Sequence, residues 1–365
     1  MSIDPSTSAA DVLVIGCGLI GLACGAAAAQ RGFRVRIVGE PRVGAASLAA
    51  AGLLAPSIER ADGHASDFAT AARDRYPTYL EWLRERTGLD VPLNRDGIIQ
   101  IALNEAGVRG LTRAKPPEAE WLDARELAQL EPALSHGLGG VLHPLDGSVD
   151  NVRLFEALRV AVDGLTAVTL ASDTVTELRF RGQVEALGRS GSVYIAEMVV
   201  LAAGAWSSTI AGLPRPIPVE PVRGQMIAYT GSPLRRAVYG PTGYAVPRVS
   251  GRTLVGATTE RAGFESITTP EGIAKLVRAA REILPQFASS QPADAWAGLR
   301  PISADLQPIL GPDLHEPRLL YATGHSRNGV LMTPLTGDCI GALVAGEPPP
   351  IDISGFSIER FAIGS

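Results

Sequence analysis

The chain has 365 residues, of which 46% are hydrophobic and 19% are charged, and its formal net charge is −5. This apolar fraction excludes a disordered chain, and the length is enough for two domains. Because the acidic chain has no clusters of lysine and arginine, its sequence argues against a nucleic-acid surface or a polybasic membrane anchor.

The N-terminal region contains an unbroken apolar run over residues 12–29, nearly long enough to span a membrane. Four glycines within this run argue against a membrane span, and the acidic segment before it argues against a signal peptide. We instead expect a buried strand over 11–15, a helix over 19–31 that ends at Gly32, and a second strand over 35–38.

The pattern Gly16-x-Gly18-x-x-Gly21 falls between this strand and this helix. In that setting the glycines permit a tight turn, a close approach of a pyrophosphate and close helix–strand packing, and the helix N-terminus offers free N–H groups. The pattern therefore predicts a site for a dinucleotide, FAD or NAD. An acid that binds the ribose should end the second strand; that position holds Gly39, so Glu40 is our candidate.

The next segments predict a mixture of helices and strands. Arg42 is placed near the adenylate phosphate, and the small residues of 43–56 form either a tightly packed loop with a short helix or a backbone segment that passes over a cofactor. Further along the chain we expect an amphipathic helix over 66–87, a strand over 97–103 and helices over 123–129 and 154–162.

The second half of the chain is rich in short β segments. We expect strands over 174–180, 184–187, 193–201, 222–229, 243–247 and 253–257, a helix over 270–284, a buried strand over 319–323, a glycine-rich turn over 324–329 and a helix over 335–345. Strand–glycine–helix units near residues 200 and 320 resemble the N-terminal unit. The fold class is therefore α/β (α+β overall), a Rossmann-like nucleotide-binding domain with an inserted antiparallel sheet.

The turn after the last buried strand allows two interpretations. A strand that runs into Gly324-His325-Ser326 resembles the nucleophile elbow of serine hydrolases, but Gly329 falls one position too late and no histidine follows Ser326. The alternative is a turn that brings backbone N–H groups to a cofactor. Since the five histidines have no zinc spacing, we expect no metal site, and since the three cysteines cannot form a disulfide framework, we expect a cytoplasmic location.

Several motifs occur in an order that resembles one family. These are Gly16-Cys-Gly18-Leu-Ile-Gly21, Ala49-Ala-Ala-Gly52, Asp146-Gly-Ser-Val-Asp150, Ala203-Gly-Ala-Trp206, Trp296-Ala-Gly-Leu-Arg300-Pro301 and Gly324-His-Ser-Arg327-Asn-Gly329. From about residue 11 to 347 the chain resembles the FAD-dependent amine oxidases of the D-amino-acid oxidase type, with the glycine oxidases of bacterial thiamine biosynthesis as the most similar group.

The resemblance implies a GR2-type FAD-binding domain formed by 1–90, 145–215 and 295–365, and a substrate-binding domain formed by 91–144 and 216–294. It implies that an amino acid is oxidised at Cα by hydride transfer to the flavin, that the imine hydrolyses to a 2-oxo acid and ammonia, and that dioxygen is reduced to hydrogen peroxide. The flavin does the chemistry, so no dedicated catalytic side chain is expected. The resemblance also implies noncovalent FAD, because residues 299–311, where covalent sarcosine oxidases attach their flavin, contain no cysteine.

The resemblance also implies residue roles. Arg300 and Tyr244 should bind the substrate carboxylate, and Arg327 should lie at both substrate and flavin. The residues expected around FAD are Gly16, Gly18, Leu19, Ile20, Gly21, Glu40, Ala46, Ser47, Ala51, Gly52, Leu53, Val175, Gly204, His325, Ser326, Arg327, Asn328, Gly329, Val330 and Leu331.

Two residues depart from the pattern of the resembling family. Ser326 stands where the relatives carry an aromatic residue, and Thr259 stands where they carry methionine. Both changes enlarge or polarise the pocket. Besides a glycine oxidase, the sequence therefore leaves open an oxidase or dehydrogenase for D-amino acids or for secondary amines such as sarcosine or proline. Homo-oligomerisation is also open.

Overall fold

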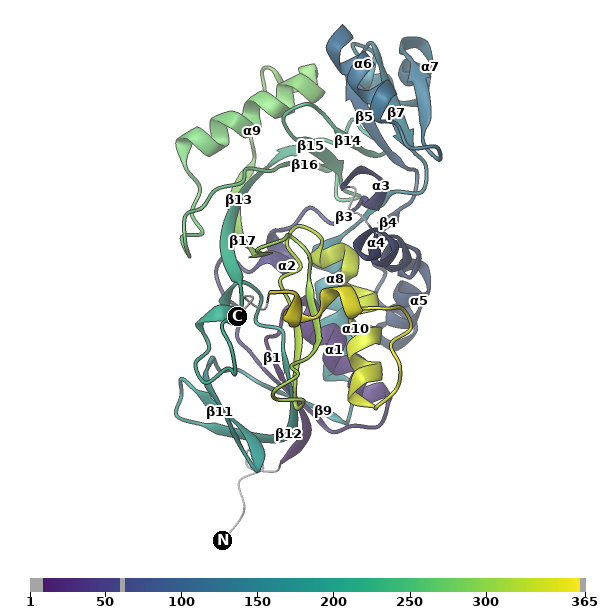
Figure 1. Cartoon of the computed structure of the whole chain (residues 1–365). Coiled ribbons are helices and arrows are strands. Elements are labelled where there is room, and N and C mark those ends of the chain that lie inside the picture. Colours follow the sequence, from purple (N-terminus) through teal and green to yellow (C-terminus); the bar gives the residue numbers. More distant parts are fainter. Residues whose placement is uncertain (1–8, 60–62, 362–365) are drawn as a thin grey trace.

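The computed structural model describes residues 9–59 and 63–361 of the chain. Figure 1 shows an elongated molecule in which one sheet with its helices occupies the lower part and a second, curved sheet the upper part. The strand pair of β13 (Val219–Thr230) and β17 (Asp294–Ser303) runs from the upper part toward the lower one. The expected mixed α/β fold is confirmed.

The lower sheet has the order β10-β11-β12-β1-β2-β9, with β19 also beside β12 and β18 beside β19. Its core is parallel, because β1 pairs in parallel with β2 and β12, β2 with β9, and β12 with β19. The strands are β1 (Ala10–Ile15), β2 (Val35–Val38), β9 (Val168–Ala171), β10 (Val175–Arg181), β11 (Gln183–Gly188), β12 (Val193–Leu201), β18 (Ile309–Pro312) and β19 (Leu319–Thr323).

Both faces of this sheet are covered, which explains the continuous apolar run near the N-terminus. Val12 and Val14 of β1 pack into a core with the helices α1, α4, α5, α8 and α10, whereas Leu13 and Ile15 pack into a second core on the opposite face. The helices of the chain are α1 (Leu19–Gln30), α2 (Ala46–Ala49), α3 (Pro56–Glu59), α4 (His64–Asp74), α5 (Tyr76–Thr87), α6 (Glu105–Ala114), α7 (Ala124–Leu130), α8 (Asn151–Asp163), α9 (Pro270–Ile283) and α10 (Gly329–Val344), with short 3₁₀ helices η2 (Pro132–Leu134), η3 (Gly204–Thr209), η4 (Pro285–Phe287), η5 (Ser354–Phe356) and η6 (Ile358–Phe361).

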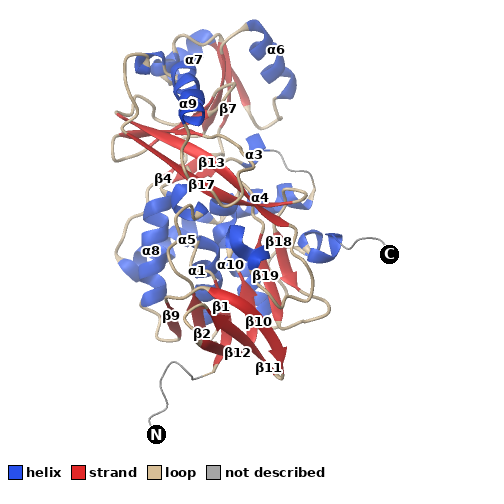
Figure 2. Ribbon diagram, turned by 90° about the vertical axis from the view of Figure 1, so that its left-hand side faces the viewer, coloured by secondary structure: helices blue, strands red, loops and turns tan. Residues whose placement is uncertain are grey.

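The upper sheet has the order β17-β13-β16-β15-β14-β5-β7-β6 and is antiparallel except where β14 runs parallel to β5. Figure 2 shows α9, α6 and α7 at this end of the molecule. Its remaining strands are β5 (Ile98–Ala102), β6 (Glu120–Asp123), β7 (Gly139–His143), β14 (Ala237–Tyr239), β15 (Tyr244–Pro247) and β16 (Arg252–Gly256), and a small third sheet joins β3 (Leu53–Leu54), β8 (Gly147–Val149) and β4 (Leu93–Asn94).

One predicted domain boundary crosses this sheet. The segment 295–365 was expected on the FAD-binding side, but β17 at its start pairs with β13 over ten residues of register. Residues 295–303 therefore belong to the upper sheet. The division into two domains remains our proposal, and β17 with β13 is the natural connection between the two parts.

Two helices differ from their predicted extents. The single helix expected over 66–87 is two helices, α4 and α5, and the second begins one residue before Pro77, whose ring cannot continue a preceding helix. The helix expected over 335–345 begins earlier, at Gly329, and contains Pro334 in its interior. The predicted start at residue 335 was therefore too late.

Pro334 is tolerated because a side chain replaces the missing backbone donor. In a regular helix the N–H at position 334 would bond to the carbonyl of Val330, and proline has no N–H. The buried Tyr76 hydroxyl instead donates to the Val330 carbonyl at 2.5 Å. The hydrogen bond therefore joins the start of α5 to the first turn of α10.

Replacing Tyr76 by phenylalanine is expected to lower the free energy of unfolding by about 1–3 kcal/mol, because the buried Val330 carbonyl would lose its donor. Tyr79→Phe on the same helix is a matched control: its buried hydroxyl has no hydrogen-bond partner among the residues described. Urea unfolding of both variants measures the difference. Equal stabilities would show that the Tyr76 bond does not support α10.

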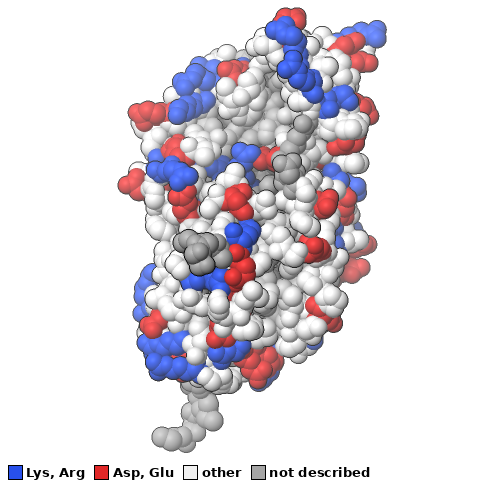
Figure 3. Space-filling view, in the orientation of Figure 1, with Lys and Arg blue, Asp and Glu red and all other residues white. Residues whose placement is uncertain are grey.

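Three further features concern the helices, the side chains that could bind metal, and the charged surface. Within residues 9–59 and 63–361, no helix has the length and apolar character needed to cross a membrane. In the same part of the chain, His, Cys, Asp and Glu side chains nowhere gather in threes around a possible metal position. On the face shown in Figure 3, basic and acidic side chains are interspersed.

Candidate active site

A cavity of about 670 Å³ lies at the carboxyl ends of the parallel strands. Glycine-containing turns after β1, β12 and β19 line it, as expected for the ligand-binding edge of a parallel sheet. Strands β13, β15 and β17 of the upper sheet close its other end. The cavity thus extends from the nucleotide-type turn to the residues predicted to bind substrate.

Almost all predicted site residues line this one cavity. The exceptions are Gly21 and Leu331. Leu331 is buried in the core between the helices, and a Cβ atom at Gly21 would stand 1.9 Å from the Gly16 carbonyl oxygen. Gly21 therefore serves the close packing of helix and strand, which was its expected part in the motif. Neither Gly21 nor Leu331 lines the cavity, and a contact of either residue with FAD stays a prediction.

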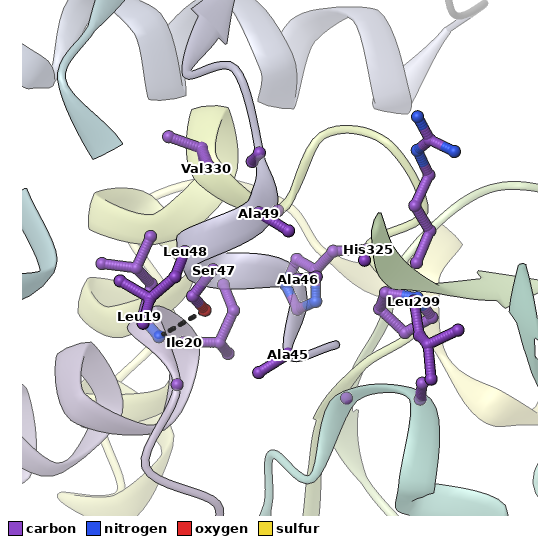
Figure 4. Close-up of a pocket in the computed structure, with 18 of the residues that line it drawn as sticks. Leu19, Ile20, Ala45, Ala46, Ser47, Leu48, Ala49, Leu299, His325 and Val330 are labelled. Carbon is purple, nitrogen blue, oxygen red and sulfur yellow. Dashed lines mark hydrogen bonds between the residues drawn. The ribbon is translucent and has the colours of Figure 1, made fainter. Parts of the chain in front are cut away.

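The turn after β1 leaves space that side chains would fill. Gly16 has a φ of +110°, and a Cβ atom there would lie 2.3 Å from the backbone oxygen of Ala202. Gly18 is the N-cap residue of α1. It has no side chain that could accept a hydrogen bond from the first N–H groups of the helix. Ser47 of α2 accepts a hydrogen bond from the Leu19 N–H at 3.0 Å, which Figure 4 shows as a dashed line. A backbone cradle of this kind fits a pyrophosphate group.

The end of β2 explains why the acidic residue is displaced by one position. A Cβ atom at Gly39 would lie 2.7 Å from the Cys17 backbone nitrogen, so the position before Glu40 admits only glycine. The Glu40 carboxylate accepts a hydrogen bond from the Thr174 hydroxyl. Glu40 lines the cavity and faces the nucleotide end, where its contact with a ribose remains a prediction.

Arg42 and Trp206 form a second feature of the nucleotide end. The Arg42 guanidinium lies 5.0 Å from the centre of the Trp206 ring and donates to the Thr174 hydroxyl oxygen at 2.8 Å. Both residues line the cavity. Trp206 is a residue whose place in the cavity was missed, since an isolated tryptophan after a buried strand is most simply read as core.

The turn between β19 and α10 is held against β17. The Ser326 N–H donates to the Pro301 carbonyl at 3.0 Å, and Ser326 adopts a left-handed φ of +52°. Its hydroxyl donates to Gly324, whereas the His325 ring contacts the Thr336 hydroxyl at 3.1 Å. Burial lowers the pKa of His325 to about 3, so the ring is neutral at physiological pH. The two side chains therefore do not form the nucleophile–base pair of a serine hydrolase.

Helix α10 begins at the cavity with free backbone donors. Its first residue is Gly329, and the preceding Asn328 makes no side-chain cap. The N-terminus of this 16-residue helix therefore presents uncapped N–H groups and its positive dipole end to the cavity. Figure 4 labels Val330 of this helix, His325 of the preceding turn and the α2 residues Ala46 and Ala49 among the residues that line the cavity.

Arg300 lies at the other end of the cavity, on β17. Its Nη1 atom donates to the Thr258 carbonyl at 3.0 Å. The guanidinium lies against the backbone of Gly224 on the neighbouring strand β13, where a Cβ atom would stand 2.2 Å from Nη1. In residues 9–59 and 63–361 it makes no ion pair with a carboxylate. Arg300 is thus a positioned cation whose remaining donors suit a planar anion.

Tyr244 also belongs to this end. Its hydroxyl donates to the sulfur of Met226 at 3.5 Å, and burial raises the pKa of Tyr244 even though the positive charge of Arg300 opposes the shift. Gly256 leaves room for the hydroxyl, since a Cβ atom there would lie 2.7 Å from it. Tyr244 is therefore a neutral hydrogen-bond donor near Arg300.

Replacing Gly224 by alanine is expected to raise the substrate KM about tenfold, because the new methyl group displaces the guanidinium of Arg300 while retaining its charge. FAD retention should be unchanged. Gly110→Ala, in α6, is the matched control, because a Cβ atom there has open space. Steady-state kinetics compare the two variants. An unaltered KM in Gly224→Ala would refute the importance of the contact between the Arg300 guanidinium and the Gly224 backbone.

Arg327 has a carboxylate partner that the sequence did not reveal. Its Nε atom lies 3.1 Å from Oε2 of Glu59, and Nη2 bonds to the same oxygen. The Tyr239 hydroxyl donates to Oε1 of Glu59 at 3.3 Å, and the Tyr239 ring centroid lies 5.5 Å from that of Tyr244. All four residues line the cavity. Glu59 and Tyr239 were missed because neither lies in a recognisable motif.

Comparisons with known proteins agree with this geometry. Residues 11–343 match the family described as "DAO: FAD dependent oxidoreductase". The chain is 36% identical to the bifunctional protein ThiO/ThiG of Synechocystis sp., and the match covers 96% of this chain. The chain spans 54%, about half, of the length of that protein. It is 32% identical to a glycine oxidase of Geobacillus kaustophilus, covering 96% of this chain and 97% of that one.

The structural comparison gives the same result. The crystal structure of glycine oxidase from Geobacillus kaustophilus matches with a TM-score of 0.91 and 31% identity, covering 98% of this chain and 100% of that one. The resemblance stated from the motifs is thereby confirmed, together with FAD as the cofactor. Since the family match extends over nearly the whole chain, this protein belongs to the DAO family of FAD-dependent oxidoreductases.

Proposed function

We propose that this enzyme oxidatively deaminates glycine or another small amino acid to a 2-oxo acid and ammonia, with dioxygen reduced to hydrogen peroxide. The observation that carries the proposal is Arg300, a cation without a carboxylate partner in the described chain, in the same cavity as the glycine cradle. The names of the relatives, glycine oxidase and ThiO/ThiG, support this substrate class.

The residues around the cavity fit FAD. Gly16 and Gly18 leave the space for a pyrophosphate, and Glu40, which lines the same cavity, is the residue that we propose for the ribose. The uncapped N-terminus of α10 at Gly329 also lines this cavity. When bound, FAD supplies the acceptor for hydride from the substrate Cα. Noncovalent binding is supported by Cys17, the cavity cysteine, whose pKa is raised by burial so that it stays a thiol.

Arg300 and Tyr244 account for substrate orientation. A guanidinium and a neutral phenol hydroxyl bind one carboxylate with both charge and direction, which fixes the Cα atom relative to the cavity wall. The raised pKa of Tyr244 keeps its proton available for donation. The substrate ammonium must lose a proton before hydride leaves, because a cationic nitrogen has no lone pair for the forming imine. His325 is neutral but bonded to Thr336, so we assign this proton to water.

Two finer points belong to the same proposal. Dioxygen is the proposed electron acceptor. The alternative function is an oxidase or dehydrogenase for D-amino acids or secondary amines, because Thr259 and Ser326 line the cavity where the resembling family carries bulkier residues. We also propose a cytoplasmic location, which three free cysteines support.

The test is the anaerobic reduction of the purified holoenzyme by glycine, sarcosine, D-alanine and D-proline, followed by admission of air. Loss of flavin absorbance with glycine and stoichiometric hydrogen peroxide on reoxidation are expected. Bleaching by an amine without peroxide would identify a dehydrogenase. A yellow protein that none of these amines bleaches would contradict the proposed function.

A further inference from the structure

The two arginines at the substrate end of the cavity differ in one respect. Arg327 is bound by the carboxylate of Glu59 through Nε and Nη2, and the second oxygen of that carboxylate accepts the Tyr239 hydroxyl bond. Arg300 donates to the Thr258 carbonyl and interacts with the Tyr244 hydroxyl, but within the described chain it forms no ion pair with a carboxylate. One cation of the pair is therefore already neutralised by the protein, and the other is open to a ligand.

The local charge follows from this pairing. The charged groups that act on the Tyr244 hydroxyl are Arg300, Glu59 and Arg327, so all three lie within electrostatic reach of the same point. Together they amount to one positive charge. One carboxylate on Arg300 balances that charge, whereas a second carboxylate directed toward Arg327 would meet the negative charge of Glu59.

Burial makes this arrangement selective. The Glu59 side chain is only 18% exposed, although the side chain of Arg327 is 57% exposed. A like charge brought against a largely buried carboxylate is repelled more strongly than in water, because screening is weaker there. The carboxylate is also held in place from two sides, by Arg327 and Tyr239, and cannot swing away without losing both bonds.

We propose that Glu59 is a specificity-determining residue that restricts the enzyme to amines with a single carboxylate by occupying Arg327. The inference rests on the proposed function, since it assigns the substrate carboxylate to Arg300. Removal of the Glu59 charge leaves Arg327 as a second free guanidinium in the cavity. An amine with two carboxylates then finds a partner for each of them.

Sarcosine and iminodiacetate provide a matched pair of substrates. Both are N-substituted glycines, and they differ in carrying an N-methyl or an N-carboxymethyl group. In Glu59→Gln holoenzyme, the ratio of kcat/KM for iminodiacetate to kcat/KM for sarcosine is expected to rise about tenfold or more, the effect of one charge-assisted hydrogen bond. Glu347→Gln is the control, because Glu347 pairs with Arg31 at 3.2 Å outside the cavity, and its ratio should not change.

A double variant tests whether the effect passes through Arg327. Glu59→Gln/Arg327→Gln should lose the gain for iminodiacetate. A gain that persists without Arg327 would overturn the proposal, as would an unchanged substrate ratio in a Glu59→Gln protein that retains FAD.

Ligand binding separates this inference from the proposed function. Perturbation of the flavin spectrum by acetate and malonate reports binding without turnover. Malonate should bind more tightly to Glu59→Gln than to the unaltered protein relative to acetate, even if no amine is oxidised. Equal malonate-to-acetate ratios in both proteins would overturn the role of Glu59, whereas unreactive amines with a shifted ratio would contradict only the proposed reaction.

Discussion

Replacing Arg300 by alanine is expected to raise the KM for glycine about thirtyfold to a thousandfold, which corresponds to a loss of about 2–4 kcal/mol of binding. Arg300 has no carboxylate partner in residues 9–59 and 63–361, so its removal leaves no buried acid unpaired and should cost little stability. The effect should therefore appear in substrate binding, measured by steady-state peroxide release, with FAD retained.

Two further variants define the origin of this effect. Arg300→Lys keeps the charge but not the two-pronged geometry, and its KM should lie between those of the unaltered enzyme and the alanine variant. Arg252→Ala removes an arginine that pairs with Asp294 outside the cavity, and its KM should not change. Unaltered kinetics in Arg300→Ala would remove the basis for the carboxylate site.

The second large effect is expected at the nucleotide end. In Gly16→Ala, the new Cβ atom would stand 2.3 Å from the oxygen and 2.8 Å from the carbon of the Ala202 carbonyl. Both atoms belong to the backbone of the turn that follows β12, the parallel neighbour of β1, and they cannot move independently. We expect the free energy of FAD binding to weaken by about 3 kcal/mol or more, since the cradle must open. The flavin-to-protein absorbance ratio after gel filtration measures the loss.

Gly32→Ala separates this clash from simple backbone strain. Gly32 also has a positive φ, +90°, but a Cβ atom there has nothing within 4 Å. This variant should lose about 1–2 kcal/mol of stability, the cost of a left-handed residue, and keep its FAD. Circular dichroism of both variants shows whether Gly16→Ala remains folded. Full FAD retention in Gly16→Ala would contradict the cradle assignment.

The nucleotide end could be predicted because its determinants are local in the sequence. The strand, the three glycines and the helix lie within about 20 residues, and each glycine has a steric reason that any sequence of this kind shares. Even the displacement of the acid to Glu40 is explained by one local contact, between Gly39 and Cys17. Strands β2, β12 and β19 were predicted with their observed bounds for the same reason.

The substrate end could be predicted only where a motif marked it. Arg300 and Tyr244 were inferred from resemblance, whereas Glu59 and Tyr239 belong to a short helix and a three-residue strand with no distinctive pattern. Their importance arises from contacts across long separations in the chain, as does the hydrogen bond by which Tyr76 permits Pro334 within α10. No local sequence pattern contains such contacts.

The parallel order of the first sheet has a consequence for how this enzyme is made. Strand β1 pairs with β12 and β12 pairs with β19, so the ribosome must release the chain beyond Thr323 before the sheet can close. Pairing between such distant strands is slow, and the edge of the apolar β1 that faces β12 stays unpaired meanwhile. The complete cradle exists only in the finished fold, so free FAD stabilises that fold by mass action. The supply of flavin during synthesis should therefore control how much of the chain reaches the native state.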